Sequence, residues 1–205
     1  MEYRGQLFVL SGPSGAGKST LRERIRKRFS GLWYSVSCTT RAPRAGEMDG
    51  EDYSFVTPDA FLAMVKARAL LEWAQVHGHY YGTPREQVVS SLENGRDVLL
   101  EIDVQGARQV KVHLPQACFI FVLPPDVQTL KKRLRRRGTE DESELKIRLD
   151  RATREMAEAP WYDYLVINDD LERASEELTA VITASRCRAA TVLPRVLDLV
   201  QPGNT

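Results

Sequence analysis

The chain has few cysteines and no long apolar run, and both absences narrow what the protein can be. Its 205 residues include three cysteines, Cys38, Cys118 and Cys187, which lie far apart and without C-x-x-C spacing. This argues against a disulfide framework or a zinc site and favours a reducing compartment, so we expect a cytoplasmic protein. The short apolar run near the N-terminus predicts neither a secretory signal nor a membrane span.

An excess of charge is also missing. The 29 basic and 28 acidic residues leave a formal net charge of +1, whereas general nucleic-acid binding usually requires a basic excess. The three histidines, His77, His79 and His113, suggest no metal site or catalytic dyad. No heptad repeat forces a dimer, so we expect a monomer or a weak homo-oligomer. The amino-acid composition is otherwise typical of a globular protein, and the length suits one domain.

The most informative segment is glycine-rich. Residues 12–20 read GPSGAGKST and satisfy the phosphate-loop pattern G-x-x-x-x-G-K-[ST]. Glycines let backbone N–H groups converge on a β-phosphate, Lys18 can bridge the β- and γ-phosphates, and the Ser19 hydroxyl suits a Mg²⁺ position. A strand pattern precedes the segment and a helical pattern follows it, which predicts an ATP-type site. Its expected ligands are Gly12, Pro13, Ser14, Gly15, Ala16, Gly17, Lys18, Ser19 and Thr20.

Alternating strand and helix patterns predict an α/β fold, with a five-stranded parallel sheet and helices on both faces. The expected strands are 6–10, 33–38, 97–102, 118–123 and 164–168. The expected helices are 20–29, 105–112, 126–137, 142–159 and 171–188, with a short helix and a frayed tail in 191–205.

The interval between Cys38 and Asp97 breaks this alternation. It contains three short strand patterns, at 52–56, 71–76 and 80–81, and two helix starts, at Pro58 after Thr57 and at Pro84. We interpret it as a small β-rich insertion over the carboxyl ends of the core strands, where ligands bind in such sheets. A polar, glycine-containing segment, 137–143, predicts a mobile lid between two helices.

Motifs in and after the insertion narrow the range of possible functions. Residues 35–47 read SVSCTTRAPRAGE and residues 50–56 read GEDYSFV; LEWA, HYYGT and EIDVQGA follow at 71, 79 and 101. In this order and spacing they closely resemble guanylate kinases, over about residues 5–186. The resemblance implies an ATP:GMP phosphotransferase of the P-loop nucleoside monophosphate kinases, dependent on Mg²⁺ and acting in purine nucleotide metabolism. It also implies one domain, 1–205, with a core (5–36, 97–137, 148–190), a GMP-binding region (37–96) and a lid (138–147).

The resemblance implies a pocket for the GMP phosphate, formed by Arg41, Arg44, Tyr53 and Tyr81. Two guanidinium forks and two phenolic donors suit a dianionic phosphate. Taken singly, the arginines could lie in a solvated loop and the tyrosines in the core. Four such donors around one insertion favour the phosphate pocket.

Glu72 is similar to the guanine-reading carboxylate of the family, supported by Ser37, Thr83 and Asp103. Guanine offers N1–H and N2–H as adjacent donors, which one carboxylate accepts together. Adenine presents an acceptor at N1, and a buried polar mismatch of this kind discriminates by roughly 10⁴–10⁵ in favourable cases. Whether dGMP is also used stays open.

Glu101 ends a hydrophobic strand at a Walker-B-like position, and we expect it to face the Mg²⁺ shell through water. The family commonly has aspartate there, and a purely structural role is the alternative. Of the basic residues around the lid, the resemblance assigns Arg137 and Arg148 to the ATP phosphates, and with Lys18 and Arg44 these are the expected catalytic residues. Arg133 is a further candidate ATP ligand, whereas Arg135 and Arg136 read as surface residues.

Asn168 resembles the family segment near the adenine of ATP, although Asn-Asp-Asp also makes a good turn and helix cap. Two other functions fit parts of the pattern. A non-catalytic guanylate-kinase-like module would bind phosphorylated protein partners, but such modules have typically lost the phosphate-loop lysine or the lid arginines. A related kinase acting on a phosphorylated sugar would not need the complete guanine-reading set.

Overall fold

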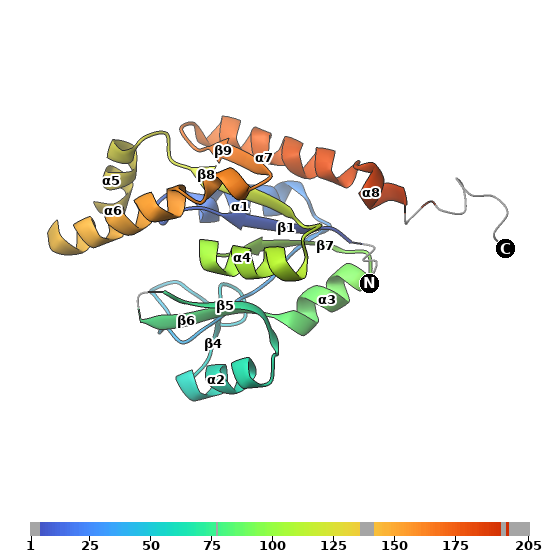
Figure 1. The fold of residues 1–205 in the computed structure, drawn as a ribbon, viewed down its shortest axis with the longest axis horizontal. Helices are drawn as coiled ribbons and strands as arrows, with labels where there is room; N and C mark the ends of the chain where they lie inside the picture. The colour runs from blue at the N-terminus through green and yellow to red at the C-terminus, as the bar shows by residue number, and fades with distance from the viewer. Residues whose placement is uncertain (1–4, 77, 136–141, 194–195, 197–205) are drawn as a thin grey trace.

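The computed structural model describes residues 5–76, 78–135, 142–193 and 196. Within these ranges the chain forms a five-stranded sheet and a four-stranded sheet, with helices around both (Figure 1). Of the predicted lid, 138–147, residues 138–141 lie outside the described ranges and residues 142–147 begin a helix. Among the described residues, no helix combines the length and the apolar character needed to cross a membrane.

The five-stranded sheet confirms the predicted parallel core. Its strands run in the order β2-β7-β1-β8-β9, and every neighbouring pair is parallel. The strands are β1 (Leu7–Ser11), β2 (Leu32–Tyr34), β7 (Asp97–Glu101), β8 (Cys118–Leu123) and β9 (Tyr164–Ile167). Parallel strands buried on both faces read as continuous apolar runs, which is why these segments were recognisable.

Both faces of this sheet are covered, as the alternation of side chains along β1 shows. Val9 lies in one buried cluster together with residues of α4, and Phe8 and Leu10 lie in the other together with residues of α1 and α7. The helices of this part are α1 (Lys18–Arg28), α4 (Val104–His113), α5 (Val127–Arg135), α6 (Glu142–Met156), α7 (Leu171–Arg186) and α8 (Ala189–Val192). A 3₁₀ turn, η1 (Ala159–Trp161), follows α6.

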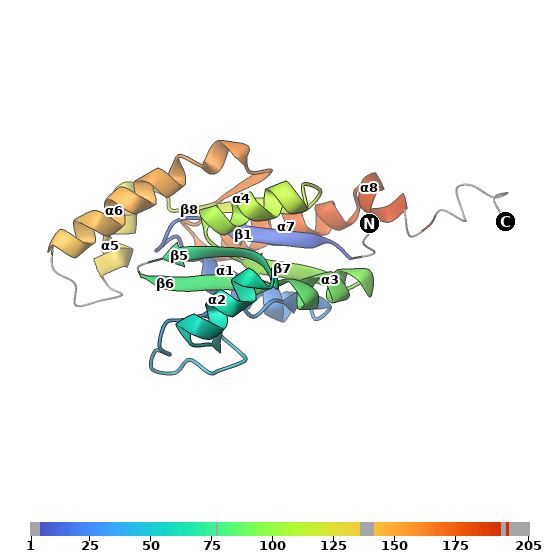
Figure 2. The same cartoon turned by 60° about the horizontal axis from the view of Figure 1, so that its bottom comes forward.

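The insertion forms the second sheet, in the order β4-β3-β6-β5. Its elements are β3 (Cys38–Thr39), β4 (Ser54–Phe55), α2 (Pro58–Lys66), β5 (Leu70–Val76), β6 (His79–Pro84) and α3 (Arg85–Glu93). A small core of Cys38, Phe61 and Leu70 holds the sheet to α2, which Figure 2 shows beneath β6. Two side chains of α3, Val88 and Leu92, instead join the main core, so α3 connects the two parts.

One predicted strand is wrong. The run at 33–38 does not form a single strand, because the chain leaves the five-stranded sheet after Tyr34 and enters the second sheet at Cys38. The backbone N–H of Ser35 still donates to Leu99 O at 3.2 Å, and the crossing then carries Ser37, which is 8% exposed, to the space between the sheets. Residues 33–38, WYSVSC, read as one strand-like run across this crossing, so the sequence did not reveal the break.

The other boundaries lie close to the prediction. Thr57 caps α2 through Oγ1, which accepts a hydrogen bond from the Ala60 N–H at 3.2 Å, and Pro58 takes the first helical position. Helix α4 occupies a central place: it covers the main sheet and also faces β5 of the second sheet (Figure 1). The space between the two sheets is therefore closed on one side by α4.

Candidate active site

The predicted phosphate loop connects β1 to α1 in a backbone shape that only glycines take easily. Gly12 and Gly17 have φ angles of 143° and 93°, and a side chain at either would collide with its surroundings. A Cβ at Gly12 would lie 2.3 Å from Val122 O. Lys18 Nζ donates to Gly12 O at 2.6 Å and to Pro13 O at 3.1 Å, so the ammonium group lies over the loop.

Three side chains from distant elements hold or approach this loop. Asn168 is buried at the end of β9, and its Nδ2 donates to Ala16 O at 2.7 Å. Arg133 of α5 donates through Nη2 to Asn168 O at 2.8 Å and through Nη1 to Ala16 O at 3.4 Å. Arg148 of α6 lies with Nη2 3.4 Å from Ser14 Oγ. The structure thus gives Asn168 and Arg133 a supporting position behind the loop, and their ATP contacts stay predictions.

The Ser19 hydroxyl and Glu101 meet at the end of β7. Ser19 Oγ donates to Glu101 Oε1 at 2.8 Å. Glu101 Oε2 lies 3.3 Å from Arg22 Nη1, and the same nitrogen donates to the Tyr34 hydroxyl at 2.9 Å. Burial lowers the pKa of Arg22, but Tyr34 and Glu101 raise it by more, so the guanidinium stays charged. Sequence reasoning missed Arg22, although its position one turn after Lys18 was a usable signal.

One cavity of about 260 Å³ joins the phosphate loop to the second sheet. The predicted residues that line it are Gly12, Ser14, Gly15, Gly17, Lys18, Ser19, Ser37, Arg44, Tyr53, Glu72, Tyr81, Glu101 and Asp103. Around it, outside its lining, lie the predicted Pro13, Ala16, Thr20, Arg41, Thr83, Arg133, Arg148 and Asn168. Arg137 lies outside the described residues. The donor and acceptor groups predicted from separate motifs therefore face one shared space.

Glu72 of β5 is the most deeply buried acid of this cavity, at 4% exposure. Its Oε1 accepts a hydrogen bond from Thr83 Oγ1 at 2.6 Å. Burial, with a smaller contribution from the nearby Asp103, raises the pKa of Glu72 to about 7, although hydrogen bonds from Thr83 oppose the change. The carboxylate is thus held in an orientation in which a ligand with paired N–H donors would satisfy its charge.

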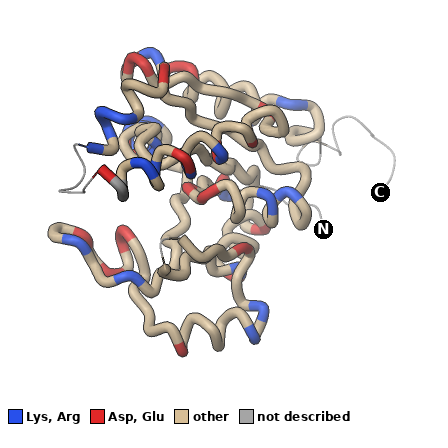
Figure 3. Tube along the Cα trace, turned by 60° about the vertical axis from the view of Figure 1, so that its left-hand side comes forward, with Lys and Arg blue, Asp and Glu red and all other residues tan. Residues whose placement is uncertain are grey.

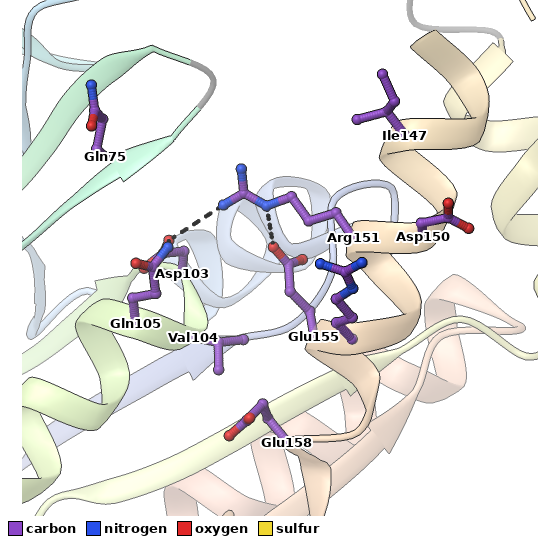
Figure 4. A pocket seen from close by; sticks show the side chains of 10 residues that line it. Gln75, Asp103, Val104, Gln105, Ile147, Asp150, Arg151, Glu155 and Glu158 are labelled. Carbon is purple, nitrogen blue, oxygen red and sulfur yellow. Dashed lines mark hydrogen bonds and ion pairs between the residues drawn. The ribbon is translucent and has the colours of Figure 1, made fainter. Parts of the chain in front are cut away.

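Asp103 caps α4 and faces α6. Its Oδ1 accepts a hydrogen bond from the Gly106 N–H at 2.8 Å, and its Oδ2 lies 3.8 Å from Arg151 Nη2. Arg151 Nε is in turn 2.8 Å from Glu155 Oε1, so Arg151 spans from α6 to the acceptor side (Figure 4). Burial raises the pKa of Asp103, while the Gly106 N–H and Arg151 oppose this.

The sequence reading also missed Arg151. It lies three residues after Arg148 on the same helix, and this spacing was an available signal. Arg151 lines both the shared cavity and an open cleft of about 520 Å³ between α4 and α6, which Ile147 of α6 also lines and which Gln75 of β5 faces from the other side (Figure 4). Charged residues of both signs are spread over both parts of the molecule (Figure 3). The electrostatics of the cavity are therefore set by local pairs such as Arg22–Glu101 and Arg151–Asp103.

The residues predicted for an acceptor phosphate form a connected group. Tyr53 and Tyr81 pack edge to face with ring centroids 5.9 Å apart, and Arg41 Nε donates to the Tyr81 hydroxyl at 3.2 Å. Glu47 orders the loop, because it binds Arg41 through two 2.9 Å hydrogen bonds and accepts from the Arg44 backbone N–H at 2.8 Å. Glu47 was not assigned a role from the sequence.

The residues around Ser19 fit a Mg²⁺ ion that a nucleotide would carry. Among the described residues, no group of three or more His, Cys, Asp or Glu is placed to hold a metal. Magnesium rarely uses an all-protein cage; it keeps several waters and shares phosphate oxygens with one or two protein ligands. The Ser19 hydroxyl with Glu101 is such a minimal set.

Comparison with known proteins identifies the family of this chain. A model of the guanylate kinase family matches residues 4–185. The chain is 49% identical to the guanylate kinase of Carboxydothermus hydrogenoformans over 195 residues, covering 95% of this chain and 96% of that protein. It is 49% identical to that of Caldanaerobacter subterraneus subsp. tengcongensis over 188 residues, covering 92% and 91%.

A solved structure has the same fold over nearly the full length. The crystal structure of guanylate kinase from Anaplasma phagocytophilum superposes with a TM-score of 0.78 at 30% identity, covering 98% of each chain. The sequence family, the overall fold and the pairing of a phosphate loop with a second charged pocket all point to the same family. The chain belongs to the guanylate kinase family.

Proposed function

We propose that this protein is a guanylate kinase that transfers the γ-phosphoryl group of ATP to GMP and yields ADP and GDP. The observation that carries the proposal is the shared cavity, in which Lys18 and Ser19 of the phosphate loop face the same space as Glu72, Tyr53 and Tyr81. Phosphoryl transfer requires the two phosphates to meet in line, with positive charge around the transferring group.

On the donor side, the loop N–H groups and Lys18 would hold the β- and γ-phosphates of ATP. Arg148 is already directed at the loop through Ser14, and we assign it, with Arg44 and Arg137, to the transferring phosphoryl group. Ser19 and, through water, Glu101 would hold Mg²⁺. The ion supplies charge neutralisation on the phosphate oxygens when it is bound. Arg133 and Asn168 complete the predicted ATP side, chiefly by fixing the loop from behind.

On the acceptor side, Arg41, Arg44, Tyr53 and Tyr81 would bind the GMP phosphate. Arg41 would bind the phosphate from a fixed position, because Glu47 holds its guanidinium group through two hydrogen bonds. The base would be read by a separate set of side chains. This set is Ser37, Glu72, Thr83 and Asp103.

The predicted division into core, GMP-binding region (37–96) and lid (138–147) is part of the proposal. It is supported by the separate second sheet and by α6, which begins within the lid range and continues as one helix past Arg148. Closure over the nucleotides would exclude water and suppress ATP hydrolysis. We further propose a cytoplasmic enzyme that acts on small molecules alone, as a monomer or a weak homo-oligomer. The free Cys38, Cys118 and Cys187 support a reducing compartment.

A coupled assay with Mg·ATP and GMP, AMP, CMP or UMP as acceptor tests the function. We expect turnover with GMP and a strong preference for it over AMP, because Glu72 pairs with guanine N1–H and N2–H. Inclusion of dGMP would show whether the 2′-hydroxyl is read. Equal turnover of AMP, or none of GMP, would overturn the proposal.

A further inference from the structure

Helix α4 contacts the base-reading residue directly, and it can do so only because position 106 is glycine. A Cβ built on Gly106 would lie 2.2 Å from Glu72 Oε2 and 2.9 Å from its Cδ. Such distances are far inside van der Waals contact, so any side chain there would displace the carboxylate. Gly106 also donates its backbone N–H to Asp103. The first turn of α4 is therefore a wall of the pocket around Glu72.

One turn later, Gln109 ties the same helix to the same strand. Its Nε2 donates to Trp73 O at 2.6 Å, and its Oε1 accepts from the Trp73 N–H at 3.2 Å. Trp73 directly follows Glu72 in β5. The side-chain amide of Gln109 thus forms hydrogen bonds with both the N–H and the C=O of Trp73, as a neighbouring strand would.

The place of β5 explains why such a bond matters. Among the described strands, β5 is the outer one of the second sheet and pairs only with β6. An edge strand presents N–H and C=O groups on its open side and is free to shift in register or twist. Its pairing with β6 is already irregular between Leu70 and Glu72. Gln109 covers this open edge at the residue next to Glu72.

We propose that Gln109 is a positioning residue for base selection, which fixes β5 against α4 so that the Glu72 carboxylate stays in its guanine-reading orientation beside Gly106. The inference deepens the proposed function and rests on it. Gln109 would act chiefly through Glu72, because the residue that it binds, Trp73, directly follows Glu72, whereas the residues proposed for the GMP phosphate come from β6 and from the loop before β4.

The test is a double-mutant cycle that measures GMP and AMP binding by calorimetry together with kcat and KM. Gln109→Met keeps the side-chain length and removes both hydrogen bonds, and the exposed Gln87→Met on α3 is the matched control. We expect Gln109→Met to raise the Kd and KM for GMP about tenfold, with a small change in kcat and in the affinity for ATP. The preference for GMP over AMP should fall by a similar factor.

The decisive comparison is made in a Glu72→Gln background. If Gln109 acts through Glu72, adding Gln109→Met to Glu72→Gln should change GMP binding very little, whereas a general loosening of the second sheet would add its full effect. An additive loss, or a loss no larger than that of Gln87→Met, overturns the inference.

Gly106→Ala provides a second, independent variant on the same wall. It should lower GMP affinity more than Gln109→Met does while ATP binding persists, and unaltered GMP affinity contradicts the proposed contact. An unmodified protein that binds GMP no better than AMP would overturn the proposed function itself. The two failures are therefore distinguishable.

Discussion

Two of the carboxylates that line the shared cavity lie on opposite sides, Glu101 toward the phosphate loop and Glu72 toward the second sheet, and their surroundings differ. Glu101 accepts a hydrogen bond from Ser19 and lies 3.3 Å from the guanidinium of Arg22. Glu72 is buried, and its hydrogen-bond donor is the neutral hydroxyl of Thr83. Burial, together with nearby Asp103, raises the pKa of Glu72 to about 7.

This difference follows from what each side has to bind. On the proposed function the donor side would bind phosphates and a cation, and its carboxylate has a charged partner, Arg22, that is part of the protein. The proposed acceptor side would have to distinguish bases, and a carboxylate whose charge is already matched would gain little from guanine. Leaving Glu72 poorly compensated costs stability and increases the difference between guanine and adenine.

The largest effect that separates the two sides is expected from Lys18→Ala. Lys18 lies over the phosphate loop, on the donor side, with its ammonium group within 3.1 Å of two loop carbonyls. Its removal should lower kcat by at least about 10²–10³-fold, the cost of losing one charged donor at a developing negative charge. Calorimetry should find GMP affinity nearly unchanged. Lys27→Ala, an exposed position of the same helix, is the control.

If Lys18→Ala weakened GMP binding as strongly as ATP binding, the two halves of the cavity would not be separable. The comparison between their carboxylates would then lose its basis.

A smaller effect is expected from Arg22→Met. The variant removes the cation beside Glu101 but leaves Ser19 and the loop in place, so it should weaken binding of ADP about tenfold in the presence of Mg²⁺ and very little in EDTA. Arg22→Lys should recover part of the loss, and Arg26→Met, on the exposed side of α1, should have no effect. Equal weakening of ADP with and without Mg²⁺ would show that Arg22 supports the fold of the loop rather than Glu101.

The sequence predicted the donor side better than the acceptor side, for a physical reason. A phosphate loop is nine consecutive residues whose backbone does the binding, so its pattern is local. The acceptor pocket collects Ser37, Glu72 and Asp103 from three separate segments, and only the family resemblance identified them together. A supporting residue such as Gln109 carries no pattern of its own, because its partners are backbone atoms of a distant strand. Arg22 offered only its spacing from Lys18 as a signal.

The parallel core was predictable because buried strands alternate with amphipathic helices. The crossing at Ser35–Ser37 was not, because residues 33–38 read as one strand-like run although the chain passes from one sheet to the other within it. That crossing nevertheless places Ser37 in the cavity. The error in the strand prediction therefore fell on a segment that forms part of the site.

The smallest expected effect concerns the folding stability that is lost because the Glu72 carboxylate is buried without a charged partner. It is measured by thermal unfolding of Glu72→Gln in the absence of nucleotide. Since the pKa of Glu72 rises from 4.5 to about 7 on folding, the folded state holds an extra proton between these pH values. The stabilisation of the folded state that this extra proton provides is fully present below pH 4.5 and is lost as the pH rises toward 7. Glutamine has no such loss and can still accept from the Thr83 hydroxyl. Glu72→Gln should therefore melt about 3–6 °C above the unmodified protein at pH 8.5 and close to it at pH 5.

The matched control for this measurement is Glu86→Gln, an exposed position on α3, which should give no pH-dependent difference. GMP adds a further arm at pH 8.5. Guanine N–H donors would satisfy the charge of Glu72, so GMP should raise the melting temperature of the unmodified protein more than that of Glu72→Gln, and the gap between the two should narrow. A gap of the same size at pH 5 and pH 8.5 would mean that Glu72 is as well compensated as Glu101, and the contrast between the two sides would disappear.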